Sequence, residues 1–180
     1  MPAMAEKLLL LEQVNLFVGD QDPEDSNHIK LQSLGLPTLE QVTVSHLGGG
    51  APGEVEFGMN AIKALQPTFK FAGFAKSSYR AMGVGTNQPL NFTGYGVLKN
   101  KQTGDTFQAK TVIRGIVSRI APDAFDRSSA FGHDHQIGEV THYELSVDNE
   151  EWFYWDYFTT RRRQFGVDEL TKARVLLGIE

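Results

Sequence analysis

Two histidines, His133 and His135, stand one residue apart and are the most metal-like feature of the sequence. Alternate residues of an extended strand point to the same side, so both imidazoles could reach one transition-metal ion. Two ligands are too few for a metal site, however, and the sequence indicates no third ligand. We therefore expect a solvated loop between Phe131 and Ile137, with no metal or other cofactor. A metal hydrolase that uses both histidines is the alternative, which metal analysis of the purified protein would test.

Other potentially reactive groups lack the partners that catalysis requires. They are the glycine clusters Gly48–Gly50 and Gly83–Gly85, the hydroxyls of Ser77 and Ser78, and the carboxylates of Glu54 and Glu56. Neither glycine cluster is followed by the Gly-Lys-Ser/Thr of a phosphate-binding loop. The serines have no evident base, and the two carboxylates are typical of an exposed acidic strand edge. We expect no catalytic residue, and the protein is predicted not to be an enzyme.

The composition narrows the class of protein. The chain has 180 residues and no cysteine, which excludes disulfides, a thiolate nucleophile and a cysteine-based zinc site. With 41% hydrophobic and 22% charged residues it is typical of a soluble globular domain. No apolar run approaches the roughly 18–20 residues that span a bilayer, so no membrane association is expected. The net charge of -5 disfavours tight wrapping of nucleic acid.

The elements that must position these residues are mostly strands. Period-two alternation and β-branched or aromatic residues indicate strands near 42–44, 90–98, 106–120, 141–147 and 152–158. Turn residues at 101–105 and at Asp148-Asn149 indicate two hairpins. Short helices are expected over 76–82 and 167–177, the second with Asp168 as a possible N-cap. Residues 21–27 are polar and indicate a surface loop. No linker divides the chain, so we expect one β-rich domain.

Two segments fit an ordinary compact monomer poorly. Residues Trp152–Phe158 carry aromatic side chains on both faces of a strand, which is typical either of a central sandwich strand or of a subunit interface. Residues His46–Glu56 are rich in glycine, so this segment is either a flexible loop or an arm that is ordered against a neighbouring subunit.

A single basic run, Arg161–Arg163, follows the aromatic strand. Guanidinium groups bind phosphate or an acidic partner surface well. Isolated charge runs are more often solvated, however, and a solvated turn is the simpler expectation here.

The order of several motifs resembles the major tube protein family of contractile phage tails, which also occurs in phage-tail-like bacteriocins. The motifs are Leu36-Pro37-Thr38-Leu39-Glu40, the loop Gly48–Val55, Gly58-Met59 before Asn60-Ala61-Ile62, the hairpin segment Tyr143–Asn149, Gly166-Val167-Asp168-Glu169-Leu170, the basic positions Lys172 and Arg174, and the ending Leu177-Gly178. The similarity runs from about Leu9 to Gly178, nearly the whole chain.

The resemblance implies a mainly β fold: a β-sandwich or barrel of the tail-tube type with one or two short helices and a long glycine-rich loop. It implies a single tail tube domain over residues 1–180, with an N-terminal arm at about 1–20, an inter-subunit loop at about 46–58 and a C-terminal helix at about 167–177. Six subunits would form a ring, and stacked rings would form a hollow tube.

The resemblance also implies partners, a location and contact residues. The partners would be other copies of the chain and the sheath, tape-measure, baseplate and terminator proteins, in a virion tail assembled in the host bacterial cytoplasm. DNA or an effector would pass through an acidic, polar bore without specific binding. Inter-subunit contacts are expected at Leu47, Gly48, Gly49, Gly50, Ala51, Pro52, Gly53, Glu54, Val55, Trp152 and Trp155. Docking to the sheath or a neighbour is expected at Arg161, Arg162 and Arg163.

Two alternatives remain from the sequence. A type VI secretion tube protein would share the tube architecture, although Gly166–Leu170 and the terminal Leu177-Gly178 favour the phage-tail branch. A β-sandwich module that binds carbohydrate or protein would instead use the aromatic strand at 152–158 as an exposed binding surface.

Overall fold

The computed structural model describes residues 7–83, 88–127 and 131–179. Val84 and Gly85 of the second glycine cluster, and residues 1–6 of the expected N-terminal arm, lie outside this range. The strands are β1 (Leu9–Val18), β2 (Leu31–Gly35), β3 (Gln41–His46), β4 (Val55–Ile62), β5 (Thr68–Ala72), β6 (Leu90–Asn100), β7 (Thr106–Pro122), β8 (Gly132–Val147), β9 (Glu150–Asp156), β10 (Arg161–Gln164) and β11 (Val167–Asp168). The helices are α1 (Lys76–Arg80), α2 (Thr171–Leu176) and a 3-10 turn at Pro23–Asp25. The expected mainly β fold with two short helices is confirmed.

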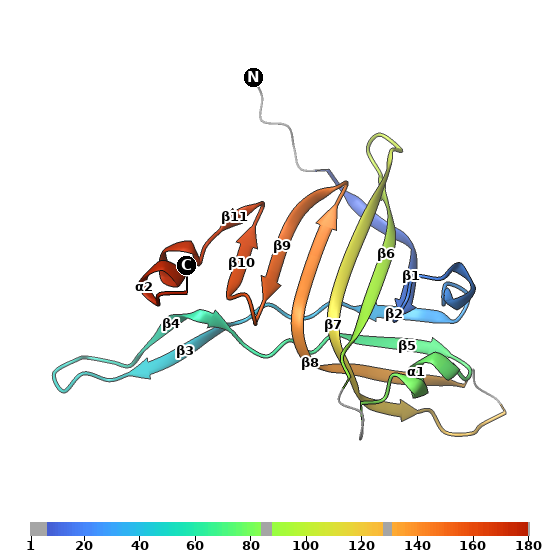
Figure 1. The fold of residues 1–180 in the computed structure, drawn as a ribbon, viewed down its shortest axis with the longest axis horizontal. Coiled ribbons are helices and arrows are strands. Elements are labelled where there is room, and N and C mark those ends of the chain that lie inside the picture. Colours follow the sequence, from blue (N-terminus) through green and yellow to red (C-terminus); the bar gives the residue numbers. More distant parts are fainter. Residues whose placement is uncertain (1–6, 84–87, 128–130, 180) are drawn as a thin grey trace.

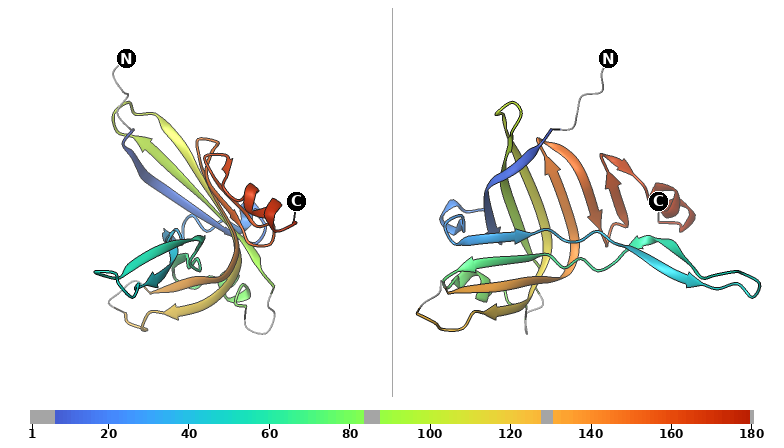
Figure 2. Two further views of the ribbon diagram at one scale, coloured as in Figure 1. Left: turned by 90° about the vertical axis from the view of Figure 1, so that its left-hand side faces the viewer. Right: turned by 180° about the vertical axis from the view of Figure 1, so that it is seen from behind.

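The main sheet folds back on itself to make two layers. Its long path is antiparallel in the order β1-β6-β7-β8-β9-β10-β11, and β5 and β2 join it through the first half of β8. Strand β8 therefore pairs with β5 near its start and with β9 near its end. Figure 2 shows the two layers meeting where β7 and β8 curve. A second, separate sheet of β3 and β4 projects away from both layers (Figure 1).

The curve in β7 and β8 has a local cause. The register of the pair shifts between Arg114 and Ile116 and again between Val117 and Arg119, and such bulges bend a strand. Opposite the first bulge, Glu139 has a positive φ of 47°. A side chain at Gly115 would lie 2.7 Å from the carbonyl oxygen of Gly138, so only glycine allows the two backbones to approach this closely.

The hydrophobic core lies between the two layers. Its largest fully buried members are Leu16, Phe69, Phe71, Phe92, Ile113, Ile137 and Tyr143. Burial raises the pKa of the Tyr143 hydroxyl to about 12, although its hydrogen bond with Thr111 opposes the shift. The alternation predicted for residues 141–147 thus has its buried face on the core, where Tyr143 and Val147 lie.

Both predicted hairpin turns are present. Asp148 and Asn149 have positive φ angles of 53° and 62° and connect β8 to β9, as a two-residue turn of this type requires. Residues 101–105 connect β6 to β7. The helix expected over 76–82 is confirmed as α1.

Four sequence expectations need correction. His133 and His135 lie in strand β8 and are buried, not in a solvated loop, because β5 and β7 pair with this segment on both sides. The run at 161–163 forms strand β10 instead of a turn. Helix α2 is shorter than residues 167–177, because Val167 and Asp168 form β11. Its N-cap is therefore Leu170, whose backbone N–H donates to the Asp168 carboxylate.

Two further boundaries differ in detail. The aromatic strand β9 ends at Asp156, so Tyr157 and Phe158 lie in the following turn. The loop at 21–27 contains the 3-10 turn, and Asn27 is buried because its side-chain amide donates to the carbonyl of Leu16 at 3.0 Å.

Candidate assembly surfaces

The hairpin of β3 and β4, which we call the arm, has one apolar and one polar face. Val44 pairs with Phe57 and His46 with Val55, while Ser45 pairs with Glu56 between them. Paired residues of an antiparallel ladder share a face and alternate residues return to it. Val44, Val55 and Phe57 therefore lie on one face, and the Phe57 and His46 rings are 6.2 Å apart there.

The apolar face of the arm is open to solvent. Val44, Val55 and Phe57 are 51%, 53% and 57% exposed. On the opposite face, the hydroxyl of Thr43 donates to the Glu56 carboxylate at 3.4 Å. In the antiparallel sheets of a folded domain the apolar face is normally the covered one. In the arm both faces are exposed, and an uncovered apolar face of this kind is typical of a surface that another chain covers.

The tip of the arm is the glycine-rich loop predicted from the sequence. The backbone N–H of Ala51 donates to the carbonyl of Gly48 at 3.0 Å and closes a turn. Side chains built at Gly49, Gly50 or Gly53 would meet no atom within 4 Å. Leu47, at the start of this loop, is also largely exposed. The loop is thus held at the end of a two-stranded arm, away from the core.

Arg162 joins the base of the arm to the main sheet. Its guanidinium group donates to the side chain of Asn60 on β4 and to the carboxylate of Glu169 after β11. Lys63 and Glu40 form an ion pair at the same end of the arm, and their backbones are hydrogen-bonded at 2.8 Å. These contacts set the direction in which the arm leaves the sheet.

The two tryptophans of β9 lie in different environments. Trp155 pairs with Tyr143 and packs against the core. Trp152 is half-exposed, its indole N–H donates to the carboxylate of Glu150 at 3.3 Å, and it borders an open groove together with Phe107 and Phe165. Trp152 is therefore accessible to another molecule without any rearrangement of the subunit. Trp155 instead makes its main contacts with the core of the subunit.

The three arginines of β10 also differ from one another. Arg163 donates two hydrogen bonds to Glu151, from Nε at 2.9 Å and from Nη2 at 2.5 Å, and lies 3.7 Å above the Tyr154 ring. The hydrogen bonds from Arg163 hold the pKa of Glu151 below its ordinary value. Arg162 is engaged at the arm base, and Arg161 is the exposed member of the run. Arg162 and Arg163 therefore have structural partners that the sequence did not reveal.

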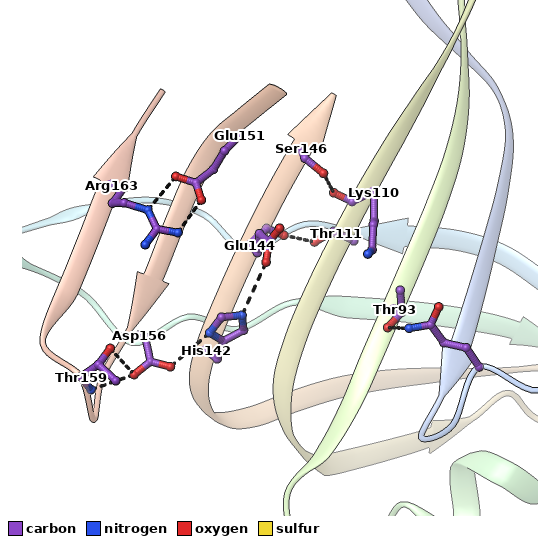
Figure 3. Close-up of polar contacts among 11 residues, drawn as sticks. Thr93, Lys110, Thr111, His142, Glu144, Ser146, Glu151, Asp156, Thr159 and Arg163 are labelled. Atoms are coloured by element: carbon purple, nitrogen blue, oxygen red, sulfur yellow. Dashed lines mark hydrogen bonds and ion pairs between the residues drawn. The ribbon is translucent and has the colours of Figure 1, made fainter. Parts of the chain in front are cut away.

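The face of the main sheet that points away from the core is polar and carries charges of both signs (Figure 3). His142 lies between two carboxylates, with Nδ1 3.2 Å from Asp156 and Nε2 4.0 Å from Glu144. Burial alone would raise the pKa of Asp156, but hydrogen bonds from Thr159 and His142 outweigh it and hold that pKa below its ordinary value. Arg163 and Glu151 form an ion pair here, whereas Lys110 and Arg114 of β7 lie on the same face without an ion pair among the described residues.

Exposed apolar side chains near the C-terminus were not predicted as a contact surface. They are Tyr157, Phe158, Phe165, Val167, Val175, Leu176 and Leu177. Helix α2, which carries Val175 and Leu176, is fixed through Arg174, a buried residue whose guanidinium group lies 2.9 Å from the Asp168 carboxylate. The spacing of the apolar residues in 170–177 predicts a helix. The same spacing does not indicate which surface covers their side chains.

The residues considered for chemistry do not come together. Within the described parts of the chain, no group of three or more histidine and acidic side chains could hold a metal ion. Ser78, which is buried, donates to the carbonyl of Ala75 at 2.8 Å and serves helix α1. In the same parts of the chain, no helix is long and apolar enough to cross a membrane.

Comparisons with known proteins identify the family. The sequence model of the family described as phage tail tube protein FII matches residues 11–178. None of the curated proteins matches the sequence.

Solved structures share the fold. The tube–sheath complex of an extracellular contractile injection system, PVC, in its extended state gives a TM-score of 0.51 at 10% identity, with 74% of this chain and 88% of that chain covered. The sheath/tube terminator of the same system gives a TM-score of 0.50 at 11% identity, with 81% of this chain and 99% of that chain covered. Since the family match spans nearly the whole chain, the protein belongs to the phage tail tube protein FII family and is a structural protein of a tail tube.

Proposed function

We propose that six copies of this chain form a ring and that stacked rings form the inner tube of a contractile tail. The family match supports this assignment, and the fold is shared with structures named as a sheath–tube complex and a sheath/tube terminator. By the same reasoning the partners are other copies of the chain, a surrounding sheath and a terminator that ends the tube. Tape-measure and baseplate proteins complete the partner set that a contractile tail requires.

The exposed apolar face of the arm carries this proposal. Val44, Val55 and Phe57 present apolar area to water although the subunit has a complete core elsewhere. Burying such area is favourable by about 25 cal/mol per Å². A neighbouring copy that covers the arm would gain this energy at every subunit of the tube. The proposed contact residues are Leu47, Gly48, Gly49, Gly50, Ala51, Pro52, Gly53, Glu54, Val55, Trp152 and Trp155, with Arg161, Arg162 and Arg163 at the adjoining edge.

The polar face of the main sheet is the surface that we assign to the bore. It carries charges of both signs, namely the carboxylates of Glu144, Glu151 and Asp156 beside the cations Lys110, Arg114 and Arg163, so it is not a uniformly basic surface for a passing polyanion. DNA, or a protein effector in a headless particle, would therefore slide past without specific binding. The protein would act in the tail of a virion or a tail-like particle, after assembly in the host cytoplasm, and no catalytic step is part of this function.

Negative-stain electron microscopy of the concentrated full-length protein tests the proposal. We expect rings and stacked tubes of uniform diameter whose abundance increases with protein concentration. Dispersed single subunits at the highest attainable concentration would contradict it, and would favour the β-sandwich binding module.

A further inference from the structure

The histidine pair of β8 is buried between the two layers of the sheet. His133 and His135 are 1% and 2% exposed. Both belong to the first half of β8, which β5 borders on one side and β7 on the other. Neither the assembly surfaces nor the polar face uses these side chains, so their burial needs a separate explanation.

Aromatic rings surround both imidazoles. The ring of His135 is stacked on Phe69, with centroids 4.4 Å apart and planes 4° apart. The ring of His133 lies 4.8 Å from Phe131, 4.9 Å from Phe74 and 5.7 Å from Tyr79 of α1. The two imidazoles are themselves 6.1 Å apart. This environment can accommodate neutral rings, but it offers little solvation to a charge.

Most of the ring nitrogens are without partners. Nδ1 of His133 lies 3.0 Å from the carbonyl of Gly73. Within the described residues, Nε2 of His133 and both nitrogens of His135 have no hydrogen-bond partner. An imidazolium has two N–H donors and a full charge. Protonation of His135 would therefore bury a charge and N–H donors that lack acceptors. Burial lowers the pKa of His135 below its ordinary value, and the backbone of Phe69 opposes this only in part.

Among the described residues, the carboxylates nearest the pair are engaged with a lysine. Asp134, between the two histidines, is exposed on the outer face, where it lies 3.5 Å from Lys70. Asp123 lies 3.2 Å from the same lysine. Arg119 of β7 borders the small cavity beside His135 and would repel an imidazolium. The residues opposite the pair on β5 are Phe69 and Phe71, and those on β7 are Ile120 and Pro122.

We propose that His135 forms an acid-sensitive lock, which holds strands β5 and β8 of this layer together while its ring is neutral and loosens them when the ring is protonated. Because the folded state disfavours the charged form of His135, its contribution to stability is complete above the unfolded pKa near 6.5. It is lost as the pH falls from there through the lowered folded pKa. The unfolding equilibrium constant should rise by up to about tenfold per pH unit as the pH falls through this window.

Denaturant unfolding of the unassembled full-length subunit between pH 7.5 and 5.0 tests the lock. The wild type should lose stability steeply over this range, whereas the variant His135→Phe should lose most of that dependence. The matched control His46→Gln removes an exposed histidine and should keep the wild-type slope. The slope is compared within each protein, so a uniformly less stable His135→Phe remains informative. A His135→Phe variant with the wild-type slope would overturn the proposal.

Nitrogen-15 NMR of the histidine rings gives a second readout that does not depend on a variant. At pH 5.5 the folded protein should show a neutral His135 imidazole. A charged His135 ring in the folded state would refute the lock. So would strong stabilisation by added Zn²⁺ at pH 7.5, because the unpartnered nitrogens would then be explained as metal ligands.

Discussion

The arm and the main sheet follow the same alternation of apolar and polar residues, but their apolar side chains differ in exposure. In β8, Tyr143 and Val147 face the core and are covered by the second layer. In β4, Val55 and Phe57 occupy equivalent alternate positions and are more than half exposed. The difference shows that the alternation specifies a strand with one face to cover, but not which molecule covers it. In the main sheet the cover is the subunit itself, and for the arm we propose a neighbouring copy.

The largest effect on the subunit is expected at the covered face. Phe71 is fully buried between the layers and touches the rings of Phe69 and His135. Phe71→Ala should lower the free energy of unfolding by about 3–5 kcal/mol, from the lost burial and the cavity that remains. Urea denaturation followed by tryptophan fluorescence measures this. A loss below about 1 kcal/mol would mean that the two layers are not closely packed.

A smaller effect is expected where the arm meets the sheet. Arg162→Ala removes the hydrogen bonds to Asn60 and Glu169. We expect a loss of about 1–2 kcal/mol, mostly as faster hydrogen exchange of the β4 amides near Asn60. Lys172→Ala, which removes an exposed cation from α2, is the matched control and should leave those amides unchanged. Equal exchange in the two variants would show that Arg162 does not hold the arm.

A smaller, pH-dependent effect is expected on the polar face. Arg163 lowers the pKa of Glu151, so the stability from this pair is present above the ordinary glutamate pKa and is lost as the pH falls through the lowered folded pKa. Glu151→Gln should therefore be less stable than the wild type by about 1 kcal/mol at pH 7, with the difference vanishing in acid. The exposed control Glu54→Gln should show no such convergence. Parallel pH profiles for Glu151→Gln and the wild type would contradict the pairing.

Sequence alone was sufficient where partners are close in the chain. The hairpins around 101–105 and Asp148-Asn149 were predicted because turn residues and strand alternation act locally. The pair His133/His135 was misplaced in a loop because its cover, Phe69 and Phe71, lies on a distant strand.

The basic run Arg161–Arg163 was also misplaced because the partners of its charges lie on other strands. Residues 161–163 were expected in a solvated turn because isolated charge runs are usually solvated. Glu151 and Glu169, which neutralise Arg163 and Arg162, come close only when β9, β10 and β11 pair. The arm itself was found from its glycines, but its apolar face became apparent only from the register of β3 and β4.

The smallest effect on subunit stability is expected on the apolar face of the arm, where assembly should respond most. Phe57 is 57% exposed, so Phe57→Asp should change the free energy of unfolding by less than about 0.5 kcal/mol. Ser45→Asp is the matched control, since it adds the same charge to the opposite, polar face of the arm, where Ser45 of β3 pairs with Glu56.

The most direct measurement is sedimentation velocity of wild type, Phe57→Asp and Ser45→Asp at equal concentration. The account predicts large assemblies for the wild type and for Ser45→Asp, and folded single subunits for Phe57→Asp. Assemblies of wild-type size formed by Phe57→Asp would contradict the claim that the apolar face of the arm joins the subunits.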